Sequence, residues 1–161
     1  IWKSVNYTRI NTLGIETSSL FNLKELIAPH FLINNIYIGY SYIYQDKNEG
    51  AGYISQYALN YLKHKFVARI EHEVWNKITA SWAFRCQKRE GSYTDYSQNK
   101  NGENVKFKSY GTLDLKISWT TPKYIIYIEG NNLFDKTYYD IGNVPQPGIW
   151  IKGGANYRFN L

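Results

Sequence analysis

Residues 36–45 read Ile-Tyr-Ile-Gly-Tyr-Ser-Tyr-Ile-Tyr-Gln, and this stretch decides the class of fold. Its side chains alternate between two unlike faces. The first face is apolar and aromatic, with Ile36, Ile38, Tyr40, Tyr42 and Tyr44. The second face is mixed, with Tyr37, Gly39, Ser41, Ile43 and Gln45. Alternation with a period of two predicts a β-strand that presents different chemistry on its two sides.

The same alternation recurs along the chain. It is clear in residues 78–87 and 112–119, and it closes the sequence from Ile149 to Leu161. Less regular segments near residues 7–23, 57–74 and 123–131 also fit strands. The composition agrees, because 17% of the residues are aromatic and Met is absent, which favours strands over helices. We therefore predict an all-β chain of about seven antiparallel, up-and-down strands.

The connections between these strands alternate in length. Residues 75–77 and 120–122 are tight turns, and residues 24–32 form an intermediate connection. Residues 45–55, 88–106 and 135–147 are long and polar. Short turns at one end of an antiparallel sheet and long loops at the other are typical of an outer-membrane β-barrel.

The apolar face could point outward into lipid, or inward as the core of a soluble barrel or sandwich. Aromatic residues gather near the short-turn end, at Trp75, Trp119, Tyr124, Tyr157 and Phe159. Three tyrosines, Tyr40, Tyr42 and Tyr44, approach the long-loop end. The other face carries charges at mid-strand, at Arg69, Glu71, Arg85, Asp114, Lys116 and Arg158. Two aromatic girdles and a polar lumen favour a transmembrane barrel.

Composition excludes other classes of protein. No stretch approaches the ~20 apolar residues of a membrane helix. The net charge is +6, from 19 Lys and Arg against 13 Asp and Glu, but both signs mix in clusters such as Lys88-Arg89-Glu90. We therefore expect no nucleic-acid partner. The single cysteine, Cys86, cannot form an internal disulfide.

The end of the chain carries a more specific pattern. Residues 131–136 read Asn-Asn-Leu-Phe-Asp-Lys, Tyr138-Tyr139-Asp140 follows, and residues 156–159 read Asn-Tyr-Arg-Phe. These motifs resemble the C-terminal end of TonB-dependent outer-membrane receptors, in which Asn-Leu-Phe-Asp closes the penultimate strand and Tyr-x-Phe ends the last. Residues 11–16, with Gly14-Ile15-Glu16, are similar to another strand of that family.

The resemblance implies a transporter barrel of about 22 strands. Seven strands cannot close such a barrel, so residues 1–161 are expected to be the C-terminal part of a larger barrel, without its earlier strands or its plug domain. The implied function is active import of a scarce ligand, such as cobalamin or an iron chelate, across the outer membrane of a Gram-negative bacterium. The implied partners are the TonB complex, acting through the plug, the small-molecule ligand and outer-membrane lipid.

The last long loop supplies the candidate ligand-binding residues: Tyr138, Tyr139, Asp140, Asn143, Gln146 and Trp150. Flat aromatic surfaces with a few hydrogen-bonding groups suit a chelate, corrin or porphyrin. A second loop, with Tyr93, Asp95 and Tyr96, has similar chemistry. The alternative is that these tyrosines pack on each other and on lipid headgroups.

The end of the chain also looks like the family's assembly signal. Tyr157, Phe159 and Leu161 share one face of the last predicted strand. The resemblance implies that the barrel assembly machinery reads these residues. An ordinary lipid-facing strand would carry the same pattern, and the two roles are compatible.

Catalytic chemistry has little support in the sequence. His64 and His72 lie about 27 Å apart along one strand, too far for one metal ion. Glu71 and Glu73 share a face, but lumen charges bridged by Arg69 and Lys65 explain them more simply than a carboxylate pair. We expect no enzyme activity, no metal site and no cofactor. Two alternatives to the receptor stay open: a small complete outer-membrane barrel with a structural or adhesion role, and a soluble lipocalin-like barrel.

Overall fold

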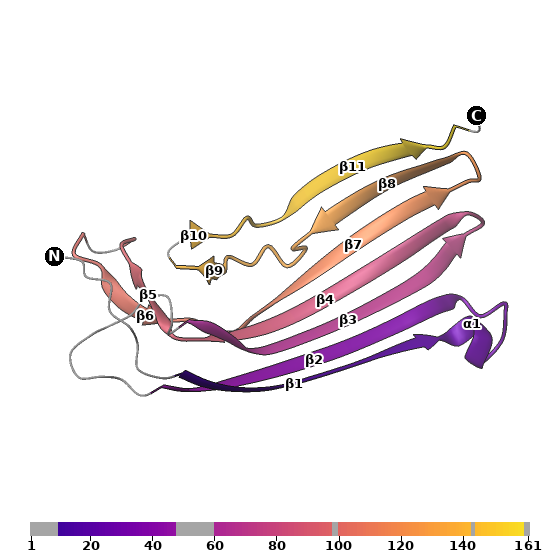
Figure 1. Cartoon of the computed structure of the whole chain (residues 1–161). Helices are drawn as coiled ribbons and strands as arrows, with labels where there is room; N and C mark the ends of the chain where they lie inside the picture. The colour runs from indigo at the N-terminus through magenta and orange to yellow at the C-terminus, as the bar shows by residue number, and fades with distance from the viewer. Residues whose placement is uncertain (1–9, 48–59, 98–99, 143, 160–161) are drawn as a thin grey trace.

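In the computed structural model, which describes residues 10–47, 60–97, 100–142 and 144–159, the chain forms one large antiparallel sheet. Figure 1 shows the strands side by side in a single curved layer. The seven strands of this sheet are β1 (Ile10–Asn22), β2 (Ile33–Lys47), β3 (Tyr61–Trp75), β4 (Ile78–Glu90), β7 (Tyr110–Thr120), β8 (Tyr124–Asn131) and β11 (Trp150–Tyr157). Each strand pairs with its sequence neighbour in the order β1-β2-β3-β4-β7-β8-β11, so the predicted up-and-down sheet is confirmed.

The two ends of the sheet differ as predicted. Tight turns join β3 to β4 and β7 to β8, and the connection from β1 to β2 lies at the same end (Figure 1). The β4-to-β7 connection and the β8-to-β11 connection lie at the opposite end. We call these the turn end and the loop end. Lys77, at φ 67°, closes the turn between β3 and β4.

Smaller elements interrupt the connections, and the sequence did not indicate them. The short helix α1 (Leu23–Leu26) lies between β1 and β2. Two hairpins project at the loop end, formed by β5 (Ser92–Asp95) with β6 (Glu103–Lys106), and by β9 (Tyr139–Ile141) with β10 (Val144–Pro145).

The last strand is shorter than predicted. We expected alternation to continue to Leu161, but β11 ends at Tyr157. The reason is its partner, because β8 begins at Tyr124, which pairs with Tyr157. One further backbone bond joins the Arg158 N–H to the Lys123 carbonyl at 2.7 Å.

The pairing of the strands aligns residues of the same kind in continuous rows across the sheet. One row crosses all seven strands with polar residues only: Asn22, Asn35, Glu71, Ser81, Lys116, Glu129 and Lys152. The adjacent row, one residue away on every strand, is Phe21, Ile36, Ile70, Trp82, Leu115, Gly130 and Ile151. Successive residues of a strand point to opposite faces, so the sheet has an apolar face and a polar face.

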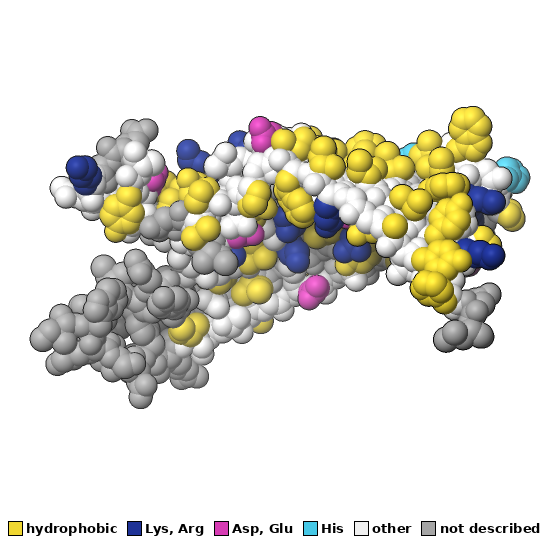
Figure 2. All heavy atoms as spheres, turned by 90° about the horizontal axis from the view of Figure 1, so that it is seen from above, with side chains coloured by type: hydrophobic (Ala, Val, Ile, Leu, Met, Phe, Trp, Pro, Cys, Tyr) yellow, Lys and Arg dark blue, Asp and Glu magenta, His cyan; other side chains and the backbone are white. Residues whose placement is uncertain are grey.

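No second layer covers the apolar face within the described residues. Leu13 is 72% exposed, Ile151 68% and Ile128 54%. Few hydrophobic residues of the described part are buried at all, namely Ala80, Phe107 and Tyr110. Figure 2, which looks down on the sheet from the β11 side, shows hydrophobic side chains crowded along its upper border. A layer in contact with water on this face would expose a large apolar patch. No helix in the described part is long and apolar enough to cross a membrane.

Candidate ligand-binding site

The Asn-Leu-Phe-Asp motif forms the base of the last long loop, directly after β8. Asn132 is 3% exposed and adopts φ 51°. Its backbone N–H donates to Asp114 Oδ1 at 2.8 Å. Its side-chain Nδ2 donates to the carbonyls of Lys136 at 2.9 Å and Pro147 at 3.1 Å, and its Oδ1 accepts from the Lys136 N–H at 3.1 Å. One amide therefore ties together both ends of the loop.

Asp135 completes this base. It adopts φ 48°, and its Oδ1 accepts the Ile149 N–H at 2.9 Å, just before β11 begins. Gly148 lies against this carboxylate, where a Cβ would stand only 2.3 Å from Asp135 Oδ1. A larger residue at that position would have to displace the Asp135 carboxylate, so the close approach favours glycine. The motif that carried the family resemblance therefore has a structural role here, which is to fix the loop on the sheet.

Tyr138 and Asp140 pack on the first residue of β7. The Tyr138 ring stacks on Tyr110, with centroids 4.2 Å apart and planes inclined by 21°. The Tyr110 hydroxyl contacts both Asp140 Oδ1 and Gln87 Oε1. A phenol has one proton to donate, so only one of these two oxygens accepts it at a time. Tyr110 and Gln87 are both buried.

Tyr139 packs on the other hairpin. Its ring stacks on Tyr93 with centroids 4.7 Å apart, and Tyr93 also contacts Phe107 at 5.1 Å. The Arg89 guanidinium lies over the Phe107 ring at 5.9 Å. Burial raises the pKa of Tyr93 above its ordinary 10.0, with smaller contributions from Tyr139 and Asp95. The two stacks join the β5–β6 hairpin and the start of β7 to the last loop.

The remaining predicted ligand residues divide into three cases. The Gln146 N–H donates to the Tyr138 carbonyl at 2.8 Å, so Gln146 belongs to the same loop structure. Trp150 begins β11 on the polar face, with Lys152 Nζ 5.0 Å from its ring centroid, but no contact joins it to the tyrosine stacks among the described residues. Asn143 lies outside the described residues.

The structure therefore shows Tyr138 and Tyr139 each packed on another tyrosine of the chain. Their contact with a ligand stays a prediction. Sequence reasoning missed Tyr110, Gln87 and Phe107. Tyr110 and Gln87 could have been found, because strand pairing across the intervening loop places them opposite each other on the polar face.

Hydrogen-bond donors lie on the polar face beside the stacks. Arg85 and Thr112 are cross-strand neighbours, two residues along each strand from Gln87 and Tyr110 and on the same face. The Arg85 Nε, the Thr112 Oγ1 and the Arg89 Nε are buried without a hydrogen-bond partner among the described residues. Guanidinium groups beside hydroxyls suit an anionic ligand rich in oxygen acceptors. No group of three or more His, Cys, Asp or Glu residues in the described part is arranged to hold a metal ion.

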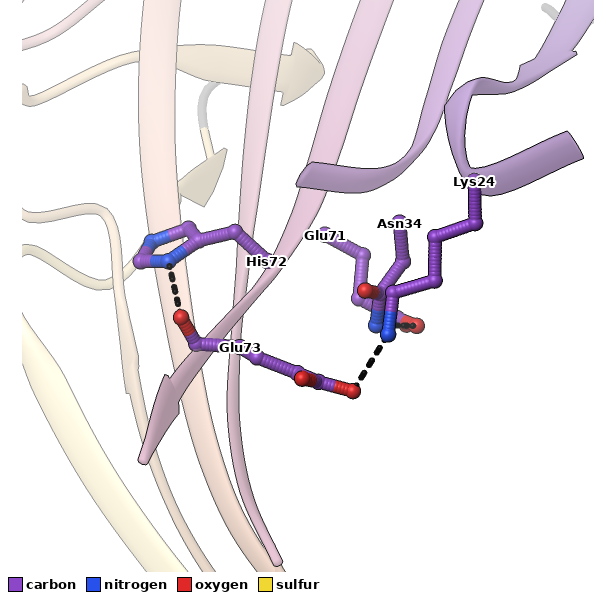
Figure 3. Close-up of polar contacts among 5 residues, drawn as sticks. All are labelled: Lys24, Asn34, Glu71, His72 and Glu73. Atoms are coloured by element: carbon purple, nitrogen blue, oxygen red, sulfur yellow. Dashed lines mark hydrogen bonds and ion pairs between the residues drawn. The ribbon is translucent and has the colours of Figure 1, made fainter. Parts of the chain in front are cut away.

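The carboxylates Glu71 and Glu73 lie at the turn end and have other partners than predicted. Lys24 Nζ contacts Glu73 Oε1 at 2.5 Å, and Asn34 Nδ2 donates to Glu71 Oε1 at 3.5 Å (Figure 3). Arg69, predicted to bridge them, lies over the Tyr37 ring instead, 5.3 Å from its centroid. The His72 ring lies away from Lys24 and Asn34, with its Nδ1 3.4 Å from the Glu73 carbonyl oxygen (Figure 3). These contacts fasten the α1 connection to β3.

Two of the predicted assembly residues, Tyr157 and Phe159, lie at the turn end of β11. The rings of Tyr157 and Phe159 pack edge to face at 4.7 Å. They are 54% and 80% exposed, respectively. Phe159 lies beyond the end of β11, and Leu161 lies outside the described residues.

A scan against models of protein families finds no match to this sequence, and a search of curated proteins finds none either. Among solved structures, the chain is similar to the FrpB iron transporter from Neisseria meningitidis, F3-3 variant, with a TM-score of 0.65 and 19% sequence identity. The similarity covers 93% of this chain and 23% of that transporter. At this identity the likeness concerns the fold, and this chain spans about a quarter of the transporter's length.

Proposed function

We propose that this chain forms part of the wall of an outer-membrane β-barrel that imports a small ligand. The observation that carries the proposal is the pair of adjacent rows across the seven strands, one wholly polar and the other apolar. Lipid on one side and a polar lumen on the other require this arrangement. The fold likeness to an iron transporter over 93% of the chain supports it.

The dimensions of the strands agree with this placement. β7 has 11 residues, and a tilted strand needs about 9–11 residues to cross a bilayer. The strands β2 and β3 have 15 residues each and extend farther at the loop end. In this proposal the turn end faces the periplasm and the loop end faces the outside.

The proposed ligand is an iron chelate, with cobalamin as the other ligand that the family resemblance suggests. Buried donor atoms on Arg85 and Thr112 favour an anionic chelate with oxygen acceptors. Tyr138, Tyr139, Asp140, Asn143, Gln146 and Trp150 would shape the entrance above them. Energy for import would come from TonB, acting through a plug domain in a part of the protein other than these residues. No catalytic step is part of this proposal.

Topology can be tested in intact cells with the native protein. In a Cys86→Ser background, Thr94→Cys on the β5–β6 hairpin should react with a membrane-impermeant maleimide. The matched variant Lys77→Cys, at the turn end, should react only after the outer membrane is permeabilised. Equal labelling of the two positions in intact cells would contradict the proposal, because it would place both ends on one side of the membrane.

Ligand recognition can be tested by uptake of radiolabelled ferric chelates and of cobalamin. Arg85→Gln, which keeps hydrogen-bonding capacity and removes the charge, should weaken chelate binding about tenfold, since charge-assisted bonds contribute ~1.5–3 kcal/mol. Lys88→Gln, which removes the same charge from an exposed position of β4, is the control and should bind normally. Unchanged chelate affinity in Arg85→Gln would remove that residue from the site. Cobalamin uptake without chelate uptake would replace the proposed ligand.

The assembly role of Tyr157, Phe159 and Leu161 belongs to the same proposal. Phe159→Ala should reduce the amount of folded protein in the outer membrane, and Ile149→Ala, at the other end of β11, should not. Normal insertion of Phe159→Ala would show that the ring is only one of many lipid contacts.

A further inference from the structure

The turn end brings together cations that are far apart in the sequence. Lys77 lies in the turn between β3 and β4, Lys123 in the turn between β7 and β8, and Arg158 directly after β11. Backbone bonds connect this edge, from the Thr120 N–H to the Lys77 carbonyl at 2.8 Å and from the Arg158 N–H to the Lys123 carbonyl at 2.7 Å. These cations therefore follow one another across neighbouring strands, which lie about 4.8 Å apart.

These three side chains are exposed, and none forms an ion pair with a carboxylate in the described part of the chain. The two turns themselves, residues 76–77 and 121–123, contain no Asp or Glu. The acidic residue nearest along β3, Glu73, is already paired with Lys24. The loop end differs, because both signs mix there and Lys63 pairs with Glu90 at 2.9 Å.

Exposed aromatic rings border the same edge on the apolar face. Trp75 is 76% exposed, Trp119 43%, Tyr157 54% and Phe159 80%. Figure 2 shows Lys or Arg side chains among hydrophobic side chains at this end, on the right of the view. Amphipathic rings of this kind lie at the headgroup level of a bilayer, so the cations beside them would lie at the depth of the phosphates.

We propose that Lys77, Lys123 and Arg158 form a binding surface for the headgroups of anionic phospholipids, in the leaflet that contacts the turn end. This inference rests on the membrane placement proposed above. The occupant follows from charge complementarity, because three unpaired cations next to an aromatic border match a phosphate-rich layer. The surface holds negatively charged lipids at one rim of the sheet and fixes its depth.

The native protein, inserted into nanodiscs that contain phosphatidylcholine and phosphatidylglycerol, provides the test. Native mass spectrometry of the protein released from the discs measures which lipids it retains. Phosphatidylglycerol should be enriched about fivefold over its share in the disc, the factor expected for a single Lys or Arg near an anionic surface. The enrichment should fall as salt is raised, because salt screens charges near the surface.

Three triple variants distinguish an effect of this surface from an effect of the protein's net charge. Lys77→Gln with Lys123→Gln and Arg158→Gln should abolish the enrichment. Lys88→Gln with Lys106→Gln and Lys108→Gln removes the same charge from exposed loop-end positions and should retain it. The charge-preserving set Lys77→Arg, Lys123→Arg and Arg158→Lys should also retain it, which guards against an effect on folding.

Several results would overturn the inference: no enrichment in the native protein, enrichment that survives the turn-end neutralisation, or equal loss in both neutralised variants. If lipid enrichment is absent and a cysteine at position 123, from Lys123→Cys, cross-links to a soluble protein, the surface binds a protein partner instead. A native protein that does not enter the disc would contradict the proposed membrane placement. Insertion without lipid preference would contradict only the binding surface.

Discussion

Asn131 and Asn132, adjacent at the end of β8, differ in the hydrogen bonds of their side chains. The side chain of Asn132 makes three hydrogen bonds that connect β8, the loop and Pro147. The Asn131 Nδ2, one residue earlier, is buried without a partner among the described residues. A sequence motif alone does not reveal this difference, because both positions carry the same amide.

Asn132→Ala should lower the free energy of unfolding by about 2–4 kcal/mol, because it leaves buried backbone groups of the loop unsatisfied. The positive φ of Asn132 adds a smaller cost in alanine. Asn131→Ala is the matched control and should change stability by less than about 1 kcal/mol. Urea unfolding of the protein in lipid vesicles measures both. Equal effects of the two substitutions would contradict the described network.

The raised pKa of Tyr93 predicts that the stability of the loop-end hairpins depends on pH. Burial is the main cause that raises its pKa above the ordinary 10.0, so the fold favours the neutral phenol. The stabilisation is therefore complete below pH 10.0 and is lost as the pH rises through the higher pKa of the folded state. Proteolysis of the loops, measured against pH, should show a rise at alkaline pH. Tyr93→Phe should weaken this rise, and an identical profile for the variant would contradict the assignment.

At the scale of elements, the two loop-end hairpins are joined by side chains and not by strand pairing. Tyr93 of β5 stacks on Tyr139 of β9, and Tyr110 of β7 stacks on Tyr138. The hairpins form separate two-stranded sheets. An isolated hairpin has little stability in water, so we expect the stacks to stabilise both hairpins.

A double-mutant cycle on Tyr93→Ala and Tyr139→Ala should give a coupling free energy of about 0.5–1.5 kcal/mol, typical of a stacked aromatic pair. Hydrogen exchange of the β5–β6 and β9–β10 amides provides the local stability. The pair Tyr96→Ala and Tyr139→Ala, which are not in contact in the described structure, should be additive. Additivity of the first pair would mean that the hairpins pack independently.

The strands and the loops differ in how far the sequence predicts them. The strand β7 could be predicted because Leu113, Leu115 and Ile117 alternate with charged or polar residues, and register then extends that pattern across the sheet. The stacking of Tyr138 on Tyr110 could not be predicted, because it depends on how a long loop folds back on the sheet. The end of β11 depended on where its partner β8 begins, which the alternation of β11 alone cannot show.

At the scale of the whole molecule, the sheet is a single two-faced layer. A charge placed on its apolar face should therefore cost more than the same charge on its polar face. Ile117 lies between Ala80 and Ile128 on the apolar face. Ile117→Lys should destabilise the protein in lipid by about 1–3 kcal/mol, because Ile117 lies between the bilayer midplane and the interface and the cost of Lys falls with distance from the midplane. The control Ser118→Lys, one residue along, should cost much less. Folding titrations into vesicles measure both variants, and equal costs would contradict a lipid-facing side.

The most direct test of a membrane-spanning sheet is a spin-label scan along β7 of the native protein in lipid, in a Cys86→Ser background. We predict that labels at Leu113, Leu115, Ile117 and Trp119 are reached by oxygen, which concentrates in the bilayer. Labels at Asp114, Lys116 and Ser118 should not follow that pattern and should be reached better by a water-soluble nickel chelate. If the odd-numbered positions were shielded from both reagents, the apolar face would be the core of a soluble fold, and the account of a membrane-spanning wall would be wrong.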